Sequence, residues 1–110
     1  MPLGLDVHHR VRDLLDENGD VEVLVTKTQV TYRTPRRGFA VLWRPGVHLD
    51  RPPVDLVLSV LLDRPIASSR WRQVVQLSPN RWQHHLAVTG LADVDEEVAD
   101  WLREAQEAAV

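Results

Sequence analysis

The sequence predicts an α+β domain: a single antiparallel sheet of about five strands, with an N-terminal and a C-terminal helix on one face. Three observations support this prediction. Apolar residues recur at helical spacing near both ends of the chain, shorter runs between them alternate between apolar and polar residues, and proline and glycine separate those runs. Because two amphipathic helices cover only one face of such a sheet, the order α-β-β-β-β-β-α leaves the other face partly open to solvent.

The first helix is expected over residues 6–17, with Asp6 as its N-cap and His8 on the solvent side. Its apolar stripe consists of Val7, Val11, Leu14 and Leu15. The second helix is expected over residues 94–108, where Asp93 and Glu96 form a variant of the capping box.

Strand patterns lie between the helices over residues 21–25, 28–33, 39–44, 54–62, 72–77 and 81–88, of which 72–77 is short and alternates only weakly. We expect a sheet of about five strands. The segment 54–62 is the most apolar and predicts a central strand. On the helix-covered face we place Val30, Tyr32, Phe39, Val41, Trp43, Trp82 and His84.

The length of 110 residues predicts one domain, residues 1–110. The absence of cysteine excludes disulfides, thiolate catalysis and thiolate zinc sites. The sequence shows neither a signal peptide nor an apolar run approaching the ~20 residues that span a bilayer. We therefore expect a cytoplasmic protein that does not contact a membrane.

Charge is sorted along the chain. Residues 27–81 carry ten basic and three acidic residues, whereas residues 1–26 carry two and six, and residues 82–110 carry one and seven. This sorting predicts acidic helices on one side of the molecule and a basic sheet face on the other. A surface of one sign selects the molecules that approach it.

The open sheet face is expected to present Arg33, Arg44, Arg81 and His85, and Lys27 adds a cation at the turn between the first two strands. The planar guanidinium of arginine fits phosphate and carboxylate groups. These five residues form the candidate site for an anion or a partner. The alternative is that they are ordinary solvated side chains, some of them paired with acidic neighbours.

Three further residues are expected to flank this face: Arg36 and Arg37 in a hairpin turn, and Trp71 in an exposed loop. A basic sheet face with aromatic neighbours is typical of nucleic-acid platforms. The pI of about 5.9 argues against a general nucleic-acid binder, for which a pI above ~9 is usual.

No metal, cofactor or catalytic residue is expected. The histidines form two adjacent pairs, His8-His9 and His84-His85, with His48 alone. Adjacent side chains diverge on a strand and lie about 100° apart on a helix, which disfavours shared zinc ligation. His84 is expected to be a hydrogen-bonded core residue. Neither G-x-S-x-G, a glycine-rich phosphate loop nor H-E-x-x-H occurs in the sequence.

Four short motifs resemble an uncharacterised bacterial family, domain of unknown function 5655. They are VLVTKTQVTYR (residues 23–33), FAVLW (39–43), WQHHL (82–86) and the DVD (93–95) that opens the last helix. The resemblance covers nearly the whole chain. It implies a small α+β domain with a shared surface near Lys27, Arg33 and His85, and it implies no activity.

The favoured function is a non-enzymatic binding module whose basic sheet face takes an anionic partner, either nucleic acid or an acidic protein segment. The first alternative is a protein–protein interaction domain that acts as a homodimer. The second is an enzyme that uses His85 and Lys27 on a small anionic substrate, although nothing in the sequence positions a nucleophile.

Overall fold

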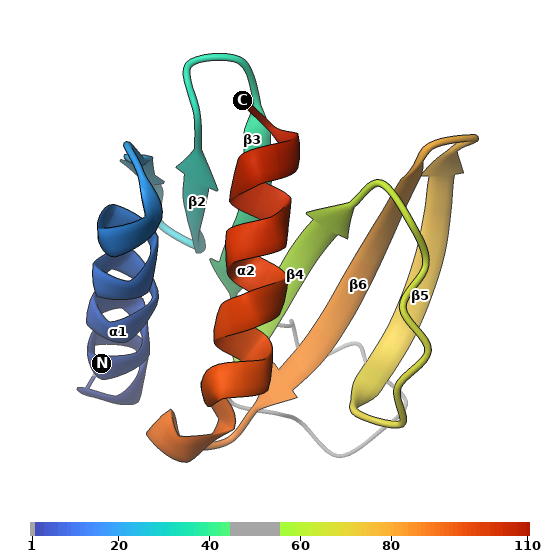
Figure 1. Ribbon diagram of the computed structural model, residues 1–110. Helices are drawn as coiled ribbons and strands as arrows, with labels where there is room; N and C mark the ends of the chain where they lie inside the picture. Colours follow the sequence, from blue (N-terminus) through green and yellow to red (C-terminus); the bar gives the residue numbers. More distant parts are fainter. Residues whose placement is uncertain (1, 45–55) are drawn as a thin grey trace.

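The computed structural model of the chain describes residues 2–44 and 56–110. Six strands form one antiparallel sheet in the order β1-β2-β3-β4-β6-β5. Both helices lie on the same face of this sheet, which confirms the predicted α+β class (Figure 1). The elements are α1 (Pro2–Asn18), β1 (Glu22–Val25), β2 (Gln29–Arg33), β3 (Gly38–Trp43), β4 (Leu56–Leu62), β5 (Trp71–Ser78), β6 (Arg81–Val88), the 3-10 helix η1 (Leu91–Asp93) and α2 (Glu96–Ala108).

The sheet has six strands rather than about five, and the expected short strand over 72–77 is part of one of them, the eight-residue β5. The register between β5 and β6 shifts twice, between Trp71 and Gln73 and between Gln76 and Ser78. Each bulge adds a residue to the strand and interrupts its alternation, which weakens the periodic signal in the sequence. Of the expected strand over residues 54–62, the first two residues lie outside the described part of the chain.

The hydrophobic core lies between the helices and the sheet. Each helix contributes the apolar stripe that its spacing predicts, and the central strands contribute the opposing layer. The fully buried members include Val7, Val11 and Leu15 of α1, Val98, Leu102 and Ala105 of α2, and Tyr32, Leu58 and Val60 of the sheet.

The helix starts differ from the predictions. α1 begins at Pro2, so Asp6 lies inside the helix and does not cap it. Proline suits the first position of a helix because its missing N–H needs no partner there. α2 begins at Glu96, and the carboxylate of Asp95 caps it by accepting the N–H of Val98 at 3.1 Å.

Asp93 is not the cap of α2, because its carboxylate is used in the preceding turn. It accepts the backbone N–H groups of Thr89 at 2.7 Å and Gly90 at 3.1 Å. These hydrogen bonds lower the pKa of Asp93, against the opposing effect of burial. The turn that they stabilise leads the chain from β6 into α2.

The prediction that Val41 and Trp43 face the helices is wrong. Tyr32 pairs with Ala40 but Arg33 pairs with Gly38, so Phe39 is an extra residue in β3. This bulge changes the alternation of the strand. Phe39 joins the buried core, whereas the continuous row Thr31, Val41, Ser59 and His85 marks the helix-free face of the sheet.

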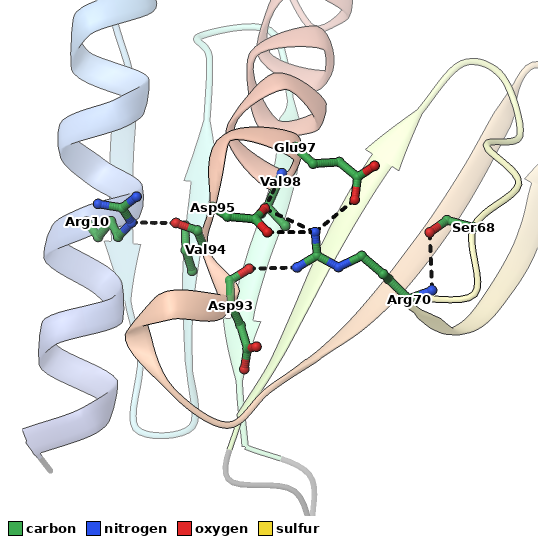
Figure 2. A network of polar contacts seen from close by, with 8 residues as sticks. All are labelled: Arg10, Ser68, Arg70, Asp93, Val94, Asp95, Glu97 and Val98. Atoms are coloured by element: carbon green, nitrogen blue, oxygen red, sulfur yellow. Dashed lines mark hydrogen bonds and ion pairs between the residues drawn. The ribbon is translucent and has the colours of Figure 1, made fainter.

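Trp71 is not an exposed loop residue. It is the first residue of β5, is only 9% exposed, and its ring centroid lies 4.3 Å from that of Trp101 in α2. Its indole N–H donates to the carbonyl of Ile66 at 3.0 Å. The segment between β4 and β5 therefore closes the core on the helix-covered side, beside the Arg70 network that Figure 2 shows at the start of α2.

Within the described part of the chain, no helix is long and apolar enough to cross a membrane. The same residues contain no group of three histidine, aspartate or glutamate side chains that is arranged to hold a metal ion. His48 lies outside the described residues.

Candidate functional site

The five predicted site residues do not gather on one surface. Arg33, paired with Gly38, and Arg81, which precedes Trp82, lie toward one end of the sheet. Lys27 and Arg44 lie at the opposite end. Gln29, which follows Lys27 by two residues, pairs with Trp43, which directly precedes Arg44. His85 lies between the two ends, opposite Ser59 of β4.

Arg33 is partly neutralised by its surroundings. Its Nε atom lies 3.6 Å from the carboxylate of Glu22 on the neighbouring strand and donates to the carbonyl of Thr34 at 3.2 Å. Arg81 is exposed at the same end of the sheet. The paired, solvated interpretation thus fits Arg33, and Arg33 and Arg81 lie at the opposite end of the sheet from Lys27 and Arg44.

Arg36 and Arg37 hold the end of α2. Arg36 Nη1 donates to the carbonyl of Val110 at 3.0 Å, and Arg37 Nη2 donates to that of Ala108 at 2.8 Å. The last carbonyls of a helix have no partner within it, and cations stabilise this negative end of the helix dipole. These arginines were expected to flank the sheet face from a hairpin turn, and their contact with the end of α2 was not predicted.

Lys27 and Arg44 line a hollow of about 630 Å³, together with His8 and His9. The hollow lies between α1, the turn that joins β1 to β2, and the adjoining ends of β3 and β4. No acidic residue lines it among the residues that the structure describes. Its apolar lining consists of Leu5, Val25, Val30, Leu42, Trp43 and Leu56.

The turn that carries Lys27 is shaped by Thr26. The N–H of Thr26 donates to the carbonyl of Gln29 at 2.8 Å, and its hydroxyl oxygen accepts the N–H groups of Gln29 at 3.2 Å and Thr28 at 3.4 Å. Hydroxyl side chains commonly stabilise turns in this way. The result is a short hairpin turn with the exposed Lys27 at its tip.

His8 enters the site through Tyr32, a contact that the sequence analysis missed because it placed His8 on the solvent side. His8 Nδ1 lies 2.8 Å from the hydroxyl of Tyr32, which is fully buried. Burial raises the pKa of Tyr32, so the phenol stays protonated. Because this buried O–H needs an acceptor, it donates a hydrogen bond to His8 Nδ1. Burial, then the positive charges of Arg12 and His9, lower the pKa of His8. At neutral pH the Nε2–H of His8 is a donor without a partner among the described residues.

A hydrogen-bonded chain crosses the helix-free face from Trp43 to His85. The indole N–H of Trp43 donates to Ser59 Oγ at 2.8 Å, and Ser59 Oγ lies 2.6 Å from His85 Nδ1. Because Ser59 is only 1% exposed, its hydroxyl proton needs a buried acceptor, and the neutral His85 Nδ1 supplies one. Burial, with His84 adding to it, lowers the pKa of His85. His85 therefore provides hydrogen bonding rather than positive charge.

This row of hydrogen bonds from Trp43 to His85 does not provide a nucleophile. The Ser59 hydroxyl is buried, and it already accepts the indole proton of Trp43. Activated serines in enzymes need a reachable oxygen and a base that is itself oriented by a third group. Trp43 is one of the residues that line the hollow with Lys27 and Arg44, and its indole begins the hydrogen-bonded chain that ends at His85 on the helix-free face.

One family matches the chain over residues 5–108, and its description reads "Domain of unknown function (DUF5655)". The match confirms the resemblance seen in the sequence, and the small α+β domain that the resemblance implied is the observed fold. No curated protein and no solved structure matched the chain.

Proposed function

Because the chain belongs to the family described as domain of unknown function 5655, a description that names no activity, we propose a function from its surface. The protein is a non-enzymatic binding module that takes an anionic group in the hollow beside α1. One observation supports this function above all: Lys27 and Arg44 come from different segments and line one hollow, with no acidic residue among its described lining.

The physical basis is electrostatic. Lys27 and Arg44 are both exposed, and no described carboxylate forms an ion pair with either of them. Two unpaired cations at the rim of a concave site attract anions and raise their local concentration. The guanidinium of Arg44 supplies a planar fork for phosphate or carboxylate, and the ammonium of Lys27 supplies a mobile point charge.

The proposed binding surface is therefore the hollow beside α1, at one end of the sheet, rather than the centre of the helix-free face. The central face offers the neutral His85, and Arg33 is already close to Glu22. The partner chemistry remains that of phosphate or carboxylate groups, which nucleic acids and acidic protein segments share. Arg81 remains a proposed contact only for a partner long enough to reach the far end of the sheet.

The test is a titration of the whole chain with anions, followed by backbone amide NMR shifts. Suitable probes are acetate, decanoate, inorganic phosphate, a single-stranded oligonucleotide and an oligo-glutamate peptide. We expect shifts centred on residues 26–28, Arg44 and the first half of α1, and binding about tenfold weaker in the Lys27→Gln/Arg44→Gln double variant. Arg103→Gln on α2 is the control, since it removes one cation that does not line the hollow.

The proposal fails if no anion binds, or if binding persists unchanged in the double variant. Shifts centred on Arg33 and Arg81 would instead restore the basic sheet face as the binding surface.

Self-association is the second candidate function. It is favoured by Leu24, which is 50% exposed and lies in the helix-free face beside Thr31. Exposed apolar residues on an uncovered sheet face suit a second copy of the chain. Sedimentation equilibrium should then give twice the 12.6 kDa mass of the chain, whereas a monomer at all concentrations would exclude this function.

A further inference from the structure

We propose that the ligand of the hollow is an amphipathic organic acid, with a carboxylate attached to an apolar body of aliphatic or aryl carbon. This inference rests on the proposed function, because it names the ligand class of the same hollow. It distinguishes a small molecule from the nucleic acids and acidic protein segments that charge alone would admit.

The apolar half of the hollow supports this ligand class. Val25 is 70% exposed and Leu5 is 54% exposed, which places both among the most exposed large apolar side chains of the described residues. They line the hollow above Leu42 and Leu56, which are buried. Exposed apolar side chains around a concave site mark a place where an apolar surface binds. A fully hydrated anion would leave this wall in water.

The polar half of the hollow suits a single carboxylate. Lys27 and Arg44 supply two cations, and His8 supplies a neutral Nε2–H donor, because its Nδ1 accepts the proton of Tyr32. Charged hydrogen bonds to a carboxylate are about twice as strong as neutral ones, and Arg44 can make two of them in parallel. One end of the ligand is therefore held by charge while its body packs on the apolar wall.

The size of the hollow agrees with a small molecule. Its volume of about 630 Å³ lies within the range of roughly 300–1,000 Å³ that is usual for sites that bind small molecules. Such sites are mostly apolar with a few well-placed polar groups, as this one is. A nucleic-acid strand would engage Lys27 and Arg44 but would set its hydrated backbone against Val25 and Leu5.

The experiment separates the charge from the apolar body of the ligand. Decanoate carries both, acetate carries only the charge, and decanol carries only the apolar chain. Each is titrated into the whole chain, decanoate below its critical micelle concentration and decanol below its solubility limit, and followed by amide NMR shifts and calorimetry. We expect decanoate to bind at least about tenfold more tightly than acetate or decanol.

Variants then assign the two halves of the site. Lys27→Gln/Arg44→Gln should weaken decanoate about tenfold while leaving decanol unchanged, and Val25→Ser should weaken decanoate and decanol alike. Arg103→Gln should change neither. All of these side chains except that of Arg103 are exposed, so the variants should fold, which circular dichroism and thermal unfolding verify.

Equal affinity for acetate and decanoate would overturn this inference and leave the proposed function intact, provided that binding needs Lys27 and Arg44. Tighter binding of the oligonucleotide or the oligo-glutamate peptide than of decanoate would also overturn the ligand class proposed here and leave the proposed function intact. If the double variant binds every anion as well as the wild type does, both proposals are wrong.

Discussion

His84 shows how a single buried side chain joins a loop to the sheet. Its Nε2 accepts the N–H of Ile66 at 3.1 Å, so the proton is on Nδ1, which donates toward the carbonyls of Trp82 and Val60. Its ring packs 4.8 Å from that of Trp71. Burial lowers its pKa below the ordinary value of 6.5, against the opposing effect of those carbonyls. The native state therefore requires the neutral imidazole.

This arrangement predicts a loss of stability in acid. Because the native pKa of His84 is depressed, its contribution is complete above pH 6.5 and is lost as the pH falls through the native pKa. His84→Leu should cost about 1–3 kcal/mol at pH 7.5, since it leaves the Ile66 N–H unpartnered, and should lose less stability on acidification than the wild type. Urea denaturation at pH 7.5 and 5.5 measures both effects. His9→Gln, at an exposed histidine, is the control. If the stability of His84→Leu depends on pH in the same way as that of the wild type, the assignment is wrong.

Ser59 is the second residue with a predictable role. Ser59→Ala removes the hydroxyl that links the indole N–H of Trp43 to His85 Nδ1, and we expect a cost of about 1–3 kcal/mol in the free energy of unfolding. The nitrogen shifts of His85 should indicate the Nε2–H tautomer in the wild type and a mixture in the variant. Thr31→Ala, in the same row of the sheet, provides the comparison. Unchanged shifts in Ser59→Ala would show that the chain of hydrogen bonds does not form.

At the scale of elements, α2 is held at both ends by segments distant in sequence. At its C-terminal end, the β2–β3 turn binds three successive carbonyls through Thr34, Arg36 and Arg37. At its N-terminal end, the guanidinium of Arg70 binds the cap and the first turn (Figure 2). The same guanidinium lies over the ring of Trp101. The C-terminal contact satisfies carbonyls that a helix cannot satisfy itself, whereas Arg70 binds the carboxylates of the cap residue Asp95 and of Glu97.

Thr34→Val tests the C-terminal contact, because valine keeps the shape and loses the hydroxyl. That hydroxyl is buried, donates to the carbonyl of Ala109 at 2.7 Å and accepts the N–H of Arg36 at 3.2 Å. We expect a loss of about 1–3 kcal/mol, together with faster amide hydrogen exchange in the last turn of α2. Thr28→Val, at an exposed threonine, should cost much less. Equal losses at the two sites would mean that the turn does not hold the helix.

Arg70→Met tests the N-terminal contact. Methionine retains the apolar stem beside Trp101 but removes the ion pairs with Asp95 at 3.0 Å and Glu97 at 2.8 Å. Because several groups share this guanidinium, we expect a loss of about 1–2 kcal/mol in thermal or urea unfolding. Arg64→Met removes a single exposed pair with Glu104 and should cost less stability than Arg70→Met. A larger loss of stability in Arg64→Met than in Arg70→Met would show that the Arg70 network does not stabilise the helix start.

At the scale of the whole molecule, the charge sorting has a structural explanation that the sequence analysis did not reach. Both acid-rich helices lie on one face, as expected, but many basic residues of the middle segment face them. Arg64 and Arg70 reach acidic side chains of α2 and its cap, and Arg36 and Arg37 reach its terminal carbonyls. Much of the basic segment therefore complements the acidic helix within the same molecule.

This complementarity predicts how salt affects stability. Because these pairs are largely exposed, adding NaCl up to a few hundred millimolar at pH 7 should lower the free energy of unfolding by about 1 kcal/mol or less. An increase of stability with salt would show that repulsion among the acidic residues of the helices outweighs the pairing.

The sequence by itself determined the fold class, the family and the type of almost every element, because helical and strand periodicities are local properties of the chain. It identified Lys27 and Arg44 as candidate site residues, although not that they share a hollow. It also predicted that His84 is buried and hydrogen-bonded, which the structure confirms.

Only the tertiary structure decided which residues meet. The bulge at Phe39 reverses the sides of Val41 and Trp43, and no periodicity within one strand reveals a partner's register. The pairing of Gln29 with Trp43 brings Lys27 and Arg44 to the same end of the sheet, and helix packing adds His8 and His9 to the hollow. Strand pairing and helix docking depend on contacts between segments far apart in the chain, so the pattern of any single segment does not predict them.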